Sequence, residues 1–112
     1  MTALGFQGDY YAAAKHLLAS TSLGAELPRV AHVHDDGRFL EVNLRPYAAD
    51  QLSTGEALLL DFLASLAGSG TVNLWKVLSR VDEGSRRAVV YAVGIAGGEF
   101  VPVTPVRFGG AA

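Results

Sequence analysis

The hydrophobic pattern is most pronounced over residues 53–67. Ser53 followed three residues later by Glu56 forms a capping box, which predicts that a helix begins here. On a helical wheel the polar positions form only a narrow stripe, made up of Thr54, Asp61 and Ser65. An ordinary surface helix buries an apolar stripe little wider than ~100°. We therefore expect a central Leu-rich helix that is surrounded on most sides, by the rest of its own domain or by a partner.

Residues 9–20 are predicted to form an N-terminal amphipathic helix with Asp9 as its cap. The polar side of this helix carries Lys15, His16 and Ser20. The apolar side combines two tyrosines with aliphatic residues, namely Tyr10, Tyr11, Ala14, Leu17 and Leu18. This pattern is typical of a helix that packs on one side. A loop marked by Gly24 and Pro28 is expected to follow it.

Residues 29–44 alternate as expected for a β-hairpin. The dipeptide Asp36-Gly37 is preferred in two-residue turns, and a turn at this point would place Glu41 opposite His32. One face of the hairpin would then carry the apolar residues Ala31, Val33, Leu40, Val42 and Leu44. Because a lone two-stranded hairpin is only marginally stable in water, we expect helices to cover this face.

Two further helices are predicted over residues 73–81 and 82–96. In the second, Asp82 is a plausible cap and Gly97-Gly98 a plausible stop. The alternative is a β-meander in the last third of the chain, with a strand over residues 86–95, because several residues there are β-branched. Pro102 and Pro105 cannot donate to a ladder, so residues 99–112 are expected to form an extended edge strand or tail.

The predicted fold class is therefore α+β, in one domain over residues 1–112. An N-terminal helix precedes the β-hairpin, and three helices and an extended C-terminal segment follow it. The middle of the chain holds the central Leu-rich helix. A length of 112 residues fits one domain with a modest core.

Composition favours a folded protein with some apolar surface to spare. Hydrophobic residues make up 50% of the chain and charged residues 18%, below the usual ~25%. A net charge of −2 gives no global support for nucleic-acid binding, which usually needs a basic face. Seven arginines against two lysines favour a GC-rich, bacterial or phage genome.

The chain has no cysteine, which excludes disulfides, thiolate nucleophiles and cysteine-based zinc sites. Residues 1–8 lack the basic start and apolar run of a signal peptide. No stretch reaches the ~20 apolar residues that a membrane span needs. We therefore expect a cytoplasmic protein without membrane attachment.

Residues 32–36 spell His-x-His-x-Asp through His32, His34 and Asp36. This resembles the first part of the metal-binding motif of metallo-β-lactamase-like hydrolases, which implies a metal-dependent hydrolase. That family has a further histidine after the aspartate, where Gly37 stands here. From the spacing alone, Glu41 could join the two histidines at an ion. A polar hairpin face with a His–Glu cross-strand pair is the favoured interpretation, so no metal and no cofactor are expected.

Two glycine-rich segments admit a similar comparison. Residues 97–100, Gly-Gly-Glu-Phe, resemble the Gly-Gly-(Asp/Glu)-Glu-Phe signature of diguanylate cyclases with one acidic residue missing, and a helix C-cap is the favoured interpretation. Residues 68–71 lack the lysine and spacing of a P-loop. No Gly-x-Ser-x-Gly elbow occurs. We predict that the protein is not an enzyme.

The last two helices are compatible with a helix-turn-helix. Arg86 and Arg87 would then begin the recognition helix, while Lys76 and Arg80 would contact phosphates. This DNA-binding role is the alternative function predicted from the sequence. Nucleic acid is otherwise not expected as a partner.

The favoured prediction is a small non-catalytic interaction or accessory protein. It would form a homodimer or join a larger assembly through the apolar arc of the Leu-rich helix that its own domain leaves uncovered. The candidate interaction residues are Leu59, Phe62, Leu63, Leu66 and Trp75. For each of them, ordinary core packing is an equal alternative.

Overall fold

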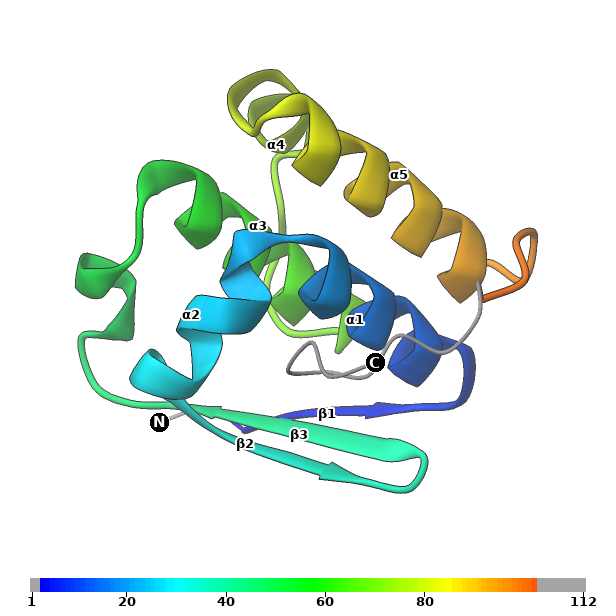
Figure 1. The fold of residues 1–112 in the computed structure, drawn as a ribbon, viewed down its shortest axis with the longest axis horizontal. Coiled ribbons are helices and arrows are strands. Elements are labelled where there is room, and N and C mark those ends of the chain that lie inside the picture. The colour runs from blue at the N-terminus through cyan, green and yellow to red at the C-terminus, as the bar shows by residue number, and fades with distance from the viewer. Residues whose placement is uncertain (1–2, 103–112) are drawn as a thin grey trace.

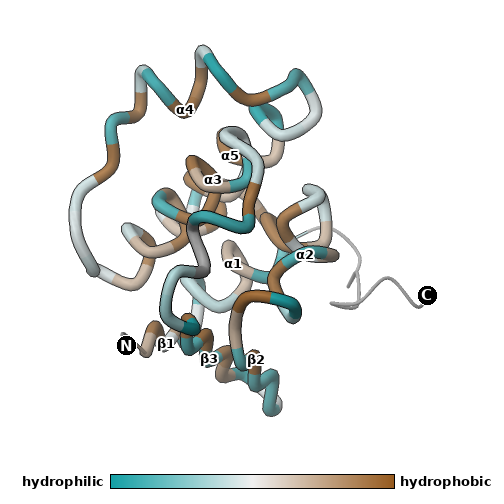
Figure 2. The backbone as a smooth tube through the Cα atoms, turned by 90° about the vertical axis from the view of Figure 1, so that its left-hand side faces the viewer, coloured by the Kyte–Doolittle hydropathy of each residue, from teal (hydrophilic) through white to brown (hydrophobic). Residues whose placement is uncertain are grey.

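A computed structural model describes residues 3–102 and shows a three-stranded antiparallel sheet covered on one face by five helices (Figure 1). The predicted α+β class is thus confirmed. Seen from the side, the sheet forms the base and the helices stack above it, with α4 farthest away (Figure 2). The elements are β1 (Ala3–Gln7), α1 (Gly8–Ser20), α2 (Ser22–Val30), β2 (Ala31–Asp36), β3 (Phe39–Leu44), a short 3₁₀ helix (Ala48–Gln51), α3 (Thr54–Leu66), α4 (Leu74–Arg80) and α5 (Glu83–Ala96).

The first strand, β1, was not predicted from the sequence. The sheet order is β1-β3-β2, and β1 pairs with β3 so that Leu4 lies opposite Val42 and Phe6 opposite Leu40. Leu4 and Phe6 are buried between exposed neighbours, which is the alternation of a half-buried strand. With five residues and Gly5 at its centre, β1 carries little local strand signal.

The hairpin forms, but its turn is one residue later than predicted. Asp36 pairs with Phe39, so Gly37 and Arg38 make the turn, and Gly37 has a φ of 65°. Only the first central residue has a positive φ, as in a II′ turn with glycine at that position. His34 therefore lies opposite Glu41, and the predicted pairing of His32 with Glu41 is wrong.

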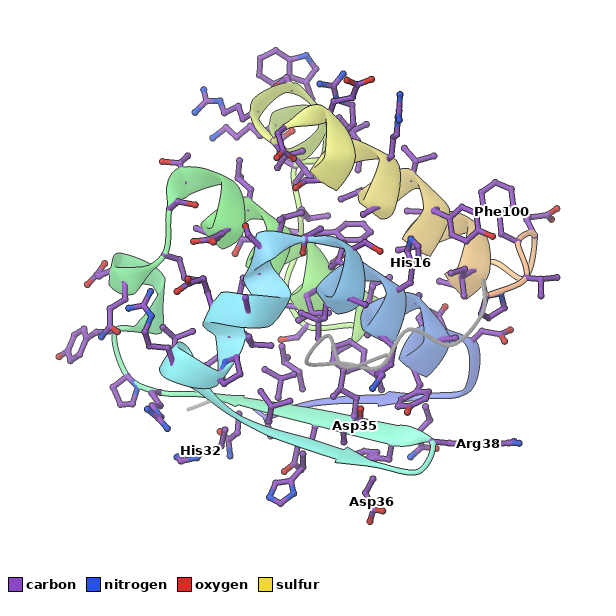
Figure 3. The ribbon with its side chains drawn as sticks, in the orientation of Figure 1. His16, His32, Asp35, Asp36, Arg38 and Phe100 are labelled. Atoms are coloured by element: carbon purple, nitrogen blue, oxygen red, sulfur yellow. The ribbon has the colours of Figure 1, made fainter. Side chains whose placement is uncertain are left out.

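The slip moves each partner by two residues, so every side chain keeps its predicted face. Asp35 lies on the helix side of the sheet, whereas Asp36 points away from the helices (Figure 3). Tyr11 donates a hydrogen bond of 3.0 Å to Oδ1 of Asp35, and Lys15 forms an ion pair with Oδ2. These contacts attach the end of the hairpin to α1.

The predicted loop after α1 is instead the helix α2, with Pro28 inside it. The buried residues of α2 recur at helical spacing, at Leu23, Leu27 and Val30. Burial of this apolar side favours the helix more than Pro28 disfavours it. Gly24 has a packing role: a Cβ there would lie 1.8 Å from the carbonyl oxygen of Leu18. Both helix breakers thus sit inside a helix, and the hairpin begins at the end of α2, later than predicted.

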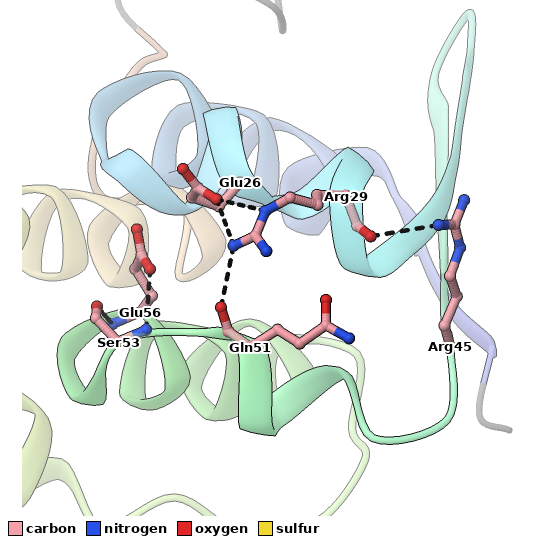
Figure 4. Close-up of polar contacts among 6 residues, drawn as sticks. All are labelled: Glu26, Arg29, Arg45, Gln51, Ser53 and Glu56. Atoms are coloured by element: carbon pink, nitrogen blue, oxygen red, sulfur yellow. Dashed lines mark hydrogen bonds and ion pairs between the residues drawn. The ribbon is translucent and has the colours of Figure 1, made fainter.

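Arginine side chains connect α2 to the segments that follow the hairpin (Figure 4). Nη2 of Arg29 donates to Oε2 of Glu26 at 2.7 Å and to the carbonyl oxygen of Gln51 at 3.0 Å. Nη1 of Arg45 donates to the carbonyl oxygen of Arg29 at 3.3 Å. The 3₁₀ helix and the end of β3 are therefore both fixed to α2.

Helix α3 begins with the predicted capping box. The amide of Glu56 donates to Oγ of Ser53 at 3.2 Å, and the amide of Ser53 donates to Oε1 of Glu56 at 3.1 Å (Figure 4). The helix ends in a Schellman motif at Gly68, whose φ is 75°. Between these ends, α3 contacts each of the other four helices, and only Thr54 and Asp61 of its residues are exposed.

The last third of the described chain is helical, so the alternative of a β-meander is wrong. Asn73 and Asp82 cap α4 and α5 through their side chains. At the other end of α5, Gly98 has a φ of 77°, and the amide of Glu99 donates to the carbonyl oxygen of Gly94 at 2.8 Å. Residues 99–102 form no strand, and the rest of the predicted edge strand or tail lies outside the described residues.

Helix α1 is the middle layer, because it packs against β1 and β3 on one side and against α5 on the other. The prediction of a helix packed on one side is therefore wrong, and His16 on its presumed polar side is half-buried against α5. Asp9 lies in the first turn of α1 and does not cap it, because the cap position belongs to Gln7. The buried apolar residues of all these layers form one core.

Gly24→Ala is expected to destabilise the fold by more than the ~1–3 kcal/mol of ordinary overpacking, because the new Cβ meets backbone rather than a movable side chain. Gly55→Ala is the matched control, since a Cβ there meets nothing within 4 Å. Because Gly55 lies in the first turn of α3, the substitution should stabilise the protein by less than the ~0.5–1 kcal/mol of a change in the middle of a helix. Urea unfolding of both variants measures the difference, and equal effects would contradict the close contact of α2 with Leu18.

Candidate functional site

Exposed large hydrophobic side chains gather at the end of the described chain. Of the eight such residues in the described part of the structure, six lie between positions 74 and 101. They belong to α4, α5 and the segment after α5: Leu74, Trp75, Val90, Val93, Phe100 and Val101. Hydrophobic and hydrophilic positions also alternate along α4 in Figure 2. Large apolar side chains left exposed in such number are typical of an interaction site.

Helix α5 has two contrasting sides. The inner side buries Ala88, Val89, Ala92 and Ile95. On the outer side, Arg86, Val90, Val93 and Gly97 are all exposed and follow one another at intervals of four, three and four residues. This spacing places them in one row. Val90 is 52% exposed and Val93 49% exposed, which is high for valines in the middle of a helix. We call this row, together with Phe100 and Val101, the α5 face.

The segment after α5 is held against the helix. A Cβ on Gly94 would lie 2.1 Å from Cδ2 of Phe100, so the Phe100 ring occupies the space that this glycine leaves open. The Phe100 ring also lies 5.0 Å from the Tyr91 ring, and the Tyr91 hydroxyl donates to the carbonyl oxygen of Val101 at 2.8 Å. Phe100, at the end of α5 in Figure 3, is therefore an ordered part of this surface. Residues 97–100 form a helix C-cap and its continuation.

A surface depression of 260 Å³ lies between α1 and α5, beside the α5 face. Its lining combines two ring side chains with small and polar residues: His16, Ser20, Gly84, Arg87, Ala88 and Tyr91. The His16 and Tyr91 rings are 4.8 Å apart, and burial lowers the pKa of His16. Nη2 of Arg87 lies 2.7 Å from Oε1 of Glu83 in an ion pair. Because this pair is exposed to solvent, it adds little to the stability of the fold.

A second cavity of 190 Å³ lies where α2, α3 and α5 begin, with Arg80 at its border. Helix N-termini attract anions, but here two carboxylates of the chain itself lie at these N-termini. Glu56 accepts the amide of Ser53, and that hydrogen bond lowers the pKa of its carboxyl. Hydrogen bonds from the side chain and amide of Ser85 lower the pKa of Asp82 in the same way. The two carboxylates thus already occupy the positions that an external anion would take.

The hairpin histidines line neither cavity. His32 points away from the helices in Figure 3, and His34 shares the same open face of the sheet beside Glu41. Within residues 3–102, no three histidine or acidic side chains are placed to hold one metal ion. Asp35 of the same segment is engaged by Tyr11 and Lys15 on the helix side. The arrangement is that of a polar sheet face.

The structure separates the five predicted interaction residues. Leu59, Phe62 and Leu63 are 2%, 3% and 0% exposed, so they belong to the core. Leu66 is half-buried against that core, and only Trp75, at 71%, stands in solvent. Reasoning from the sequence missed Val90 and Val93. Their spacing of three residues fits one side of a helix, but the β-branched residues of this segment also fit the alternative of a strand.

The four candidate DNA contacts, Lys76, Arg80, Arg86 and Arg87, are all exposed. The order of helices predicted for a helix-turn-helix is present, but only Val81 and Asp82 connect α4 to α5, where such motifs usually have three or four residues. Asp82 and Glu83 also place negative charge at the start of the would-be recognition helix.

Comparison of the chain with known protein families, curated proteins and solved structures found no match. Among the described residues, no helix has both the length and the apolar character to cross a bilayer.

The lowered pKa of His16 predicts a specific pH dependence of stability. Protonation is harder in the folded state, so the free energy of unfolding should fall as pH drops below the unfolded histidine value of about 6.5. His16→Phe keeps a ring beside Tyr91 but removes the titration, so its stability should change less between about pH 7.5 and 5.5. Urea unfolding between about pH 7.5 and 5.5 measures the free energy of unfolding of each protein. His34→Gln, on the open face of the sheet, is the control. An equal slope in His16→Phe and the unsubstituted protein would contradict the burial of His16.

Proposed function

We propose that this chain is a small non-catalytic interaction protein that docks onto a protein partner through the α5 face and the neighbouring helix α4. One observation carries the proposal: large apolar side chains that the fold leaves in solvent are concentrated on these last elements. Elsewhere the fold buries large apolar side chains, as it does in α3 with Leu59, Phe62 and Leu63. Selection for a soluble monomer alone would not favour such a row.

The chemistry of the α5 face suits a protein partner. Its centre, Val90 and Val93, carries no charge, and Arg86 lies at its border. Protein interfaces have this arrangement, with an apolar centre and a polar rim. Exposed Trp75 on α4 is the residue type most often found among energetically dominant contacts. Each ~100 Å² of apolar surface removed from water contributes about 2.5 kcal/mol before the costs of association.

The open face of the sheet is a less suitable docking surface than the α5 face. Its exposed residues are mainly polar, with His32, His34 and Asp36 on β2. Such a face is stable in water without a cover, as is common in antiparallel sheets. The α5 face is the surface whose exposure costs free energy, and hence the one where a partner gains most.

A photo-crosslinking residue placed at Val93 should capture a protein partner in cells that naturally make this chain. The matched control carries the same group at Asp36 on the open sheet face, which is also exposed. Mass spectrometry of the adducts is expected to find a defined partner, another protein or a second copy, from position 93 and none from position 36. Failure of position 93 to give a defined adduct, or equal adducts from both positions, would overturn the proposal.

A DNA-binding role is the second candidate, favoured by the exposure of Arg86 and Arg87 together on the N-terminal half of α5. If the interaction proposal holds, the chain binds duplex DNA only weakly. Replacing both arginines with alanine should then leave its affinity for DNA unchanged. Salt-dependent binding in fluorescence anisotropy that the double substitution abolishes would instead favour DNA.

A further inference from the structure

We infer that the partner of the α5 face is a second copy of this chain, packed through antiparallel pairing of α5 with α5 around a twofold axis. This inference rests on the proposed function, which assigns the α5 face to a protein partner. It adds the identity of that partner and the direction in which the two helices run.

The row of exposed residues on α5 reads the same in both directions. The intervals from Arg86 to Val90, to Val93 and to Gly97 are four, three and four residues. In an antiparallel pair with its axis midway between the valines, Val90 of one copy faces Val93 of the other. Arg86 then faces Gly97 of the second copy. A surface that matches itself after a half turn is what a symmetric dimer requires.

The ends of the row are complementary in size. Gly97 has no side chain and is exposed, so it leaves room for the long Arg86 of the second copy. At 1.5 Å per residue, Arg86 and Gly97 each lie ~6 Å along the axis from the nearest valine. After Gly97 the chain turns back along α5, so the Phe100 ring lies over Gly94 and Val101 lies beside Tyr91, on the flank of the row. Their exposed side chains add apolar surface there.

The ends of the row are also complementary in charge. Glu99, two residues after Gly97, is exposed, and Arg86 is exposed at the opposite end. Within residues 3–102, neither side chain makes a hydrogen bond or a close ion pair, although the charge of Arg86 also acts on Asp82, four residues earlier. Antiparallel pairing brings Arg86 of each copy to the end that carries Glu99 of the other, twice per dimer. Parallel pairing would bring like charges together, and would align the helix dipoles unfavourably.

Charge exchange tests this arrangement directly. Arg86→Glu creates two Glu–Glu contacts in the dimer, and Glu99→Arg creates two Arg–Arg contacts. Each variant alone should raise the dimer Kd by about tenfold or more, since two ion pairs are replaced by repulsion. When the two variants are mixed, every contact between unlike chains joins opposite charges. The mixture should therefore form dimers that neither variant forms alone, and the double variant should regain the Kd of the unsubstituted protein.

Arg87→Glu is the matched control, because it makes the same charge change one residue away, on the side of α5 that borders the depression with α1. It should leave the Kd within about threefold. Sedimentation over a dilution series measures all Kd values, and circular dichroism checks that each variant is folded.

The outcomes separate this inference from the proposal beneath it. Single variants that dimerise like the unsubstituted protein, or a mixture that does not associate, would overturn the antiparallel arrangement. A chain that stays monomeric at high micromolar concentration would overturn self-association altogether. If Val93 then still crosslinks to a different protein, the proposed function stands and only the identity of the partner is wrong.

Discussion

Covering α3 on almost every side is the constraint on which the rest of this structure depends. A helix with so narrow a polar stripe cannot rest on a sheet with one face and leave the other in water. The fold meets the demand by placing the other four helices in contact with α3 while the sheet forms the base beneath α1. Two of these helices, α2 and α4, are short, and neither has a wide apolar stripe of its own. Their arrangement follows from what α3 needs buried.

This constraint explains where apolar surface remains. Once α1 is enclosed between the sheet and α5, and α3 between all the helices, α5 is the outermost long helix. Its inner side completes the core, while Val90 and Val93 on its outer side stay about half exposed. The apolar surplus of the composition therefore does not appear on the Leu-rich helix, where the sequence suggests it. It appears on the outer side of α5, at Val90 and Val93.

Local chemistry was readable from the sequence, and spatial arrangement was not. Ser53 with Glu56, Asp82 and Gly68 mark helix ends through contacts within a few residues, so their predictions are confirmed. Gly24 misled because its role is a long-range one, the close approach of α2 to the end of α1. The hairpin turn is one residue later than predicted because glycine suits both turn types. It fits the second central position of a I′ turn at Asp36-Gly37 and the first central position of a II′ turn at Gly37-Arg38. The wide apolar arc of α3 required a cover, but no local pattern states whether the cover is the same chain or another.

Hydrogen exchange of the α3 amides over a dilution series tests the central claim most directly. If α3 is enclosed by its own chain, the amides of residues 59–63 are protected to the level of global unfolding, and their protection is the same at every concentration. Rapid exchange in the dilute protein that slows as the concentration rises would contradict the account, because it would mean that a second chain, and not the other four helices, covers α3.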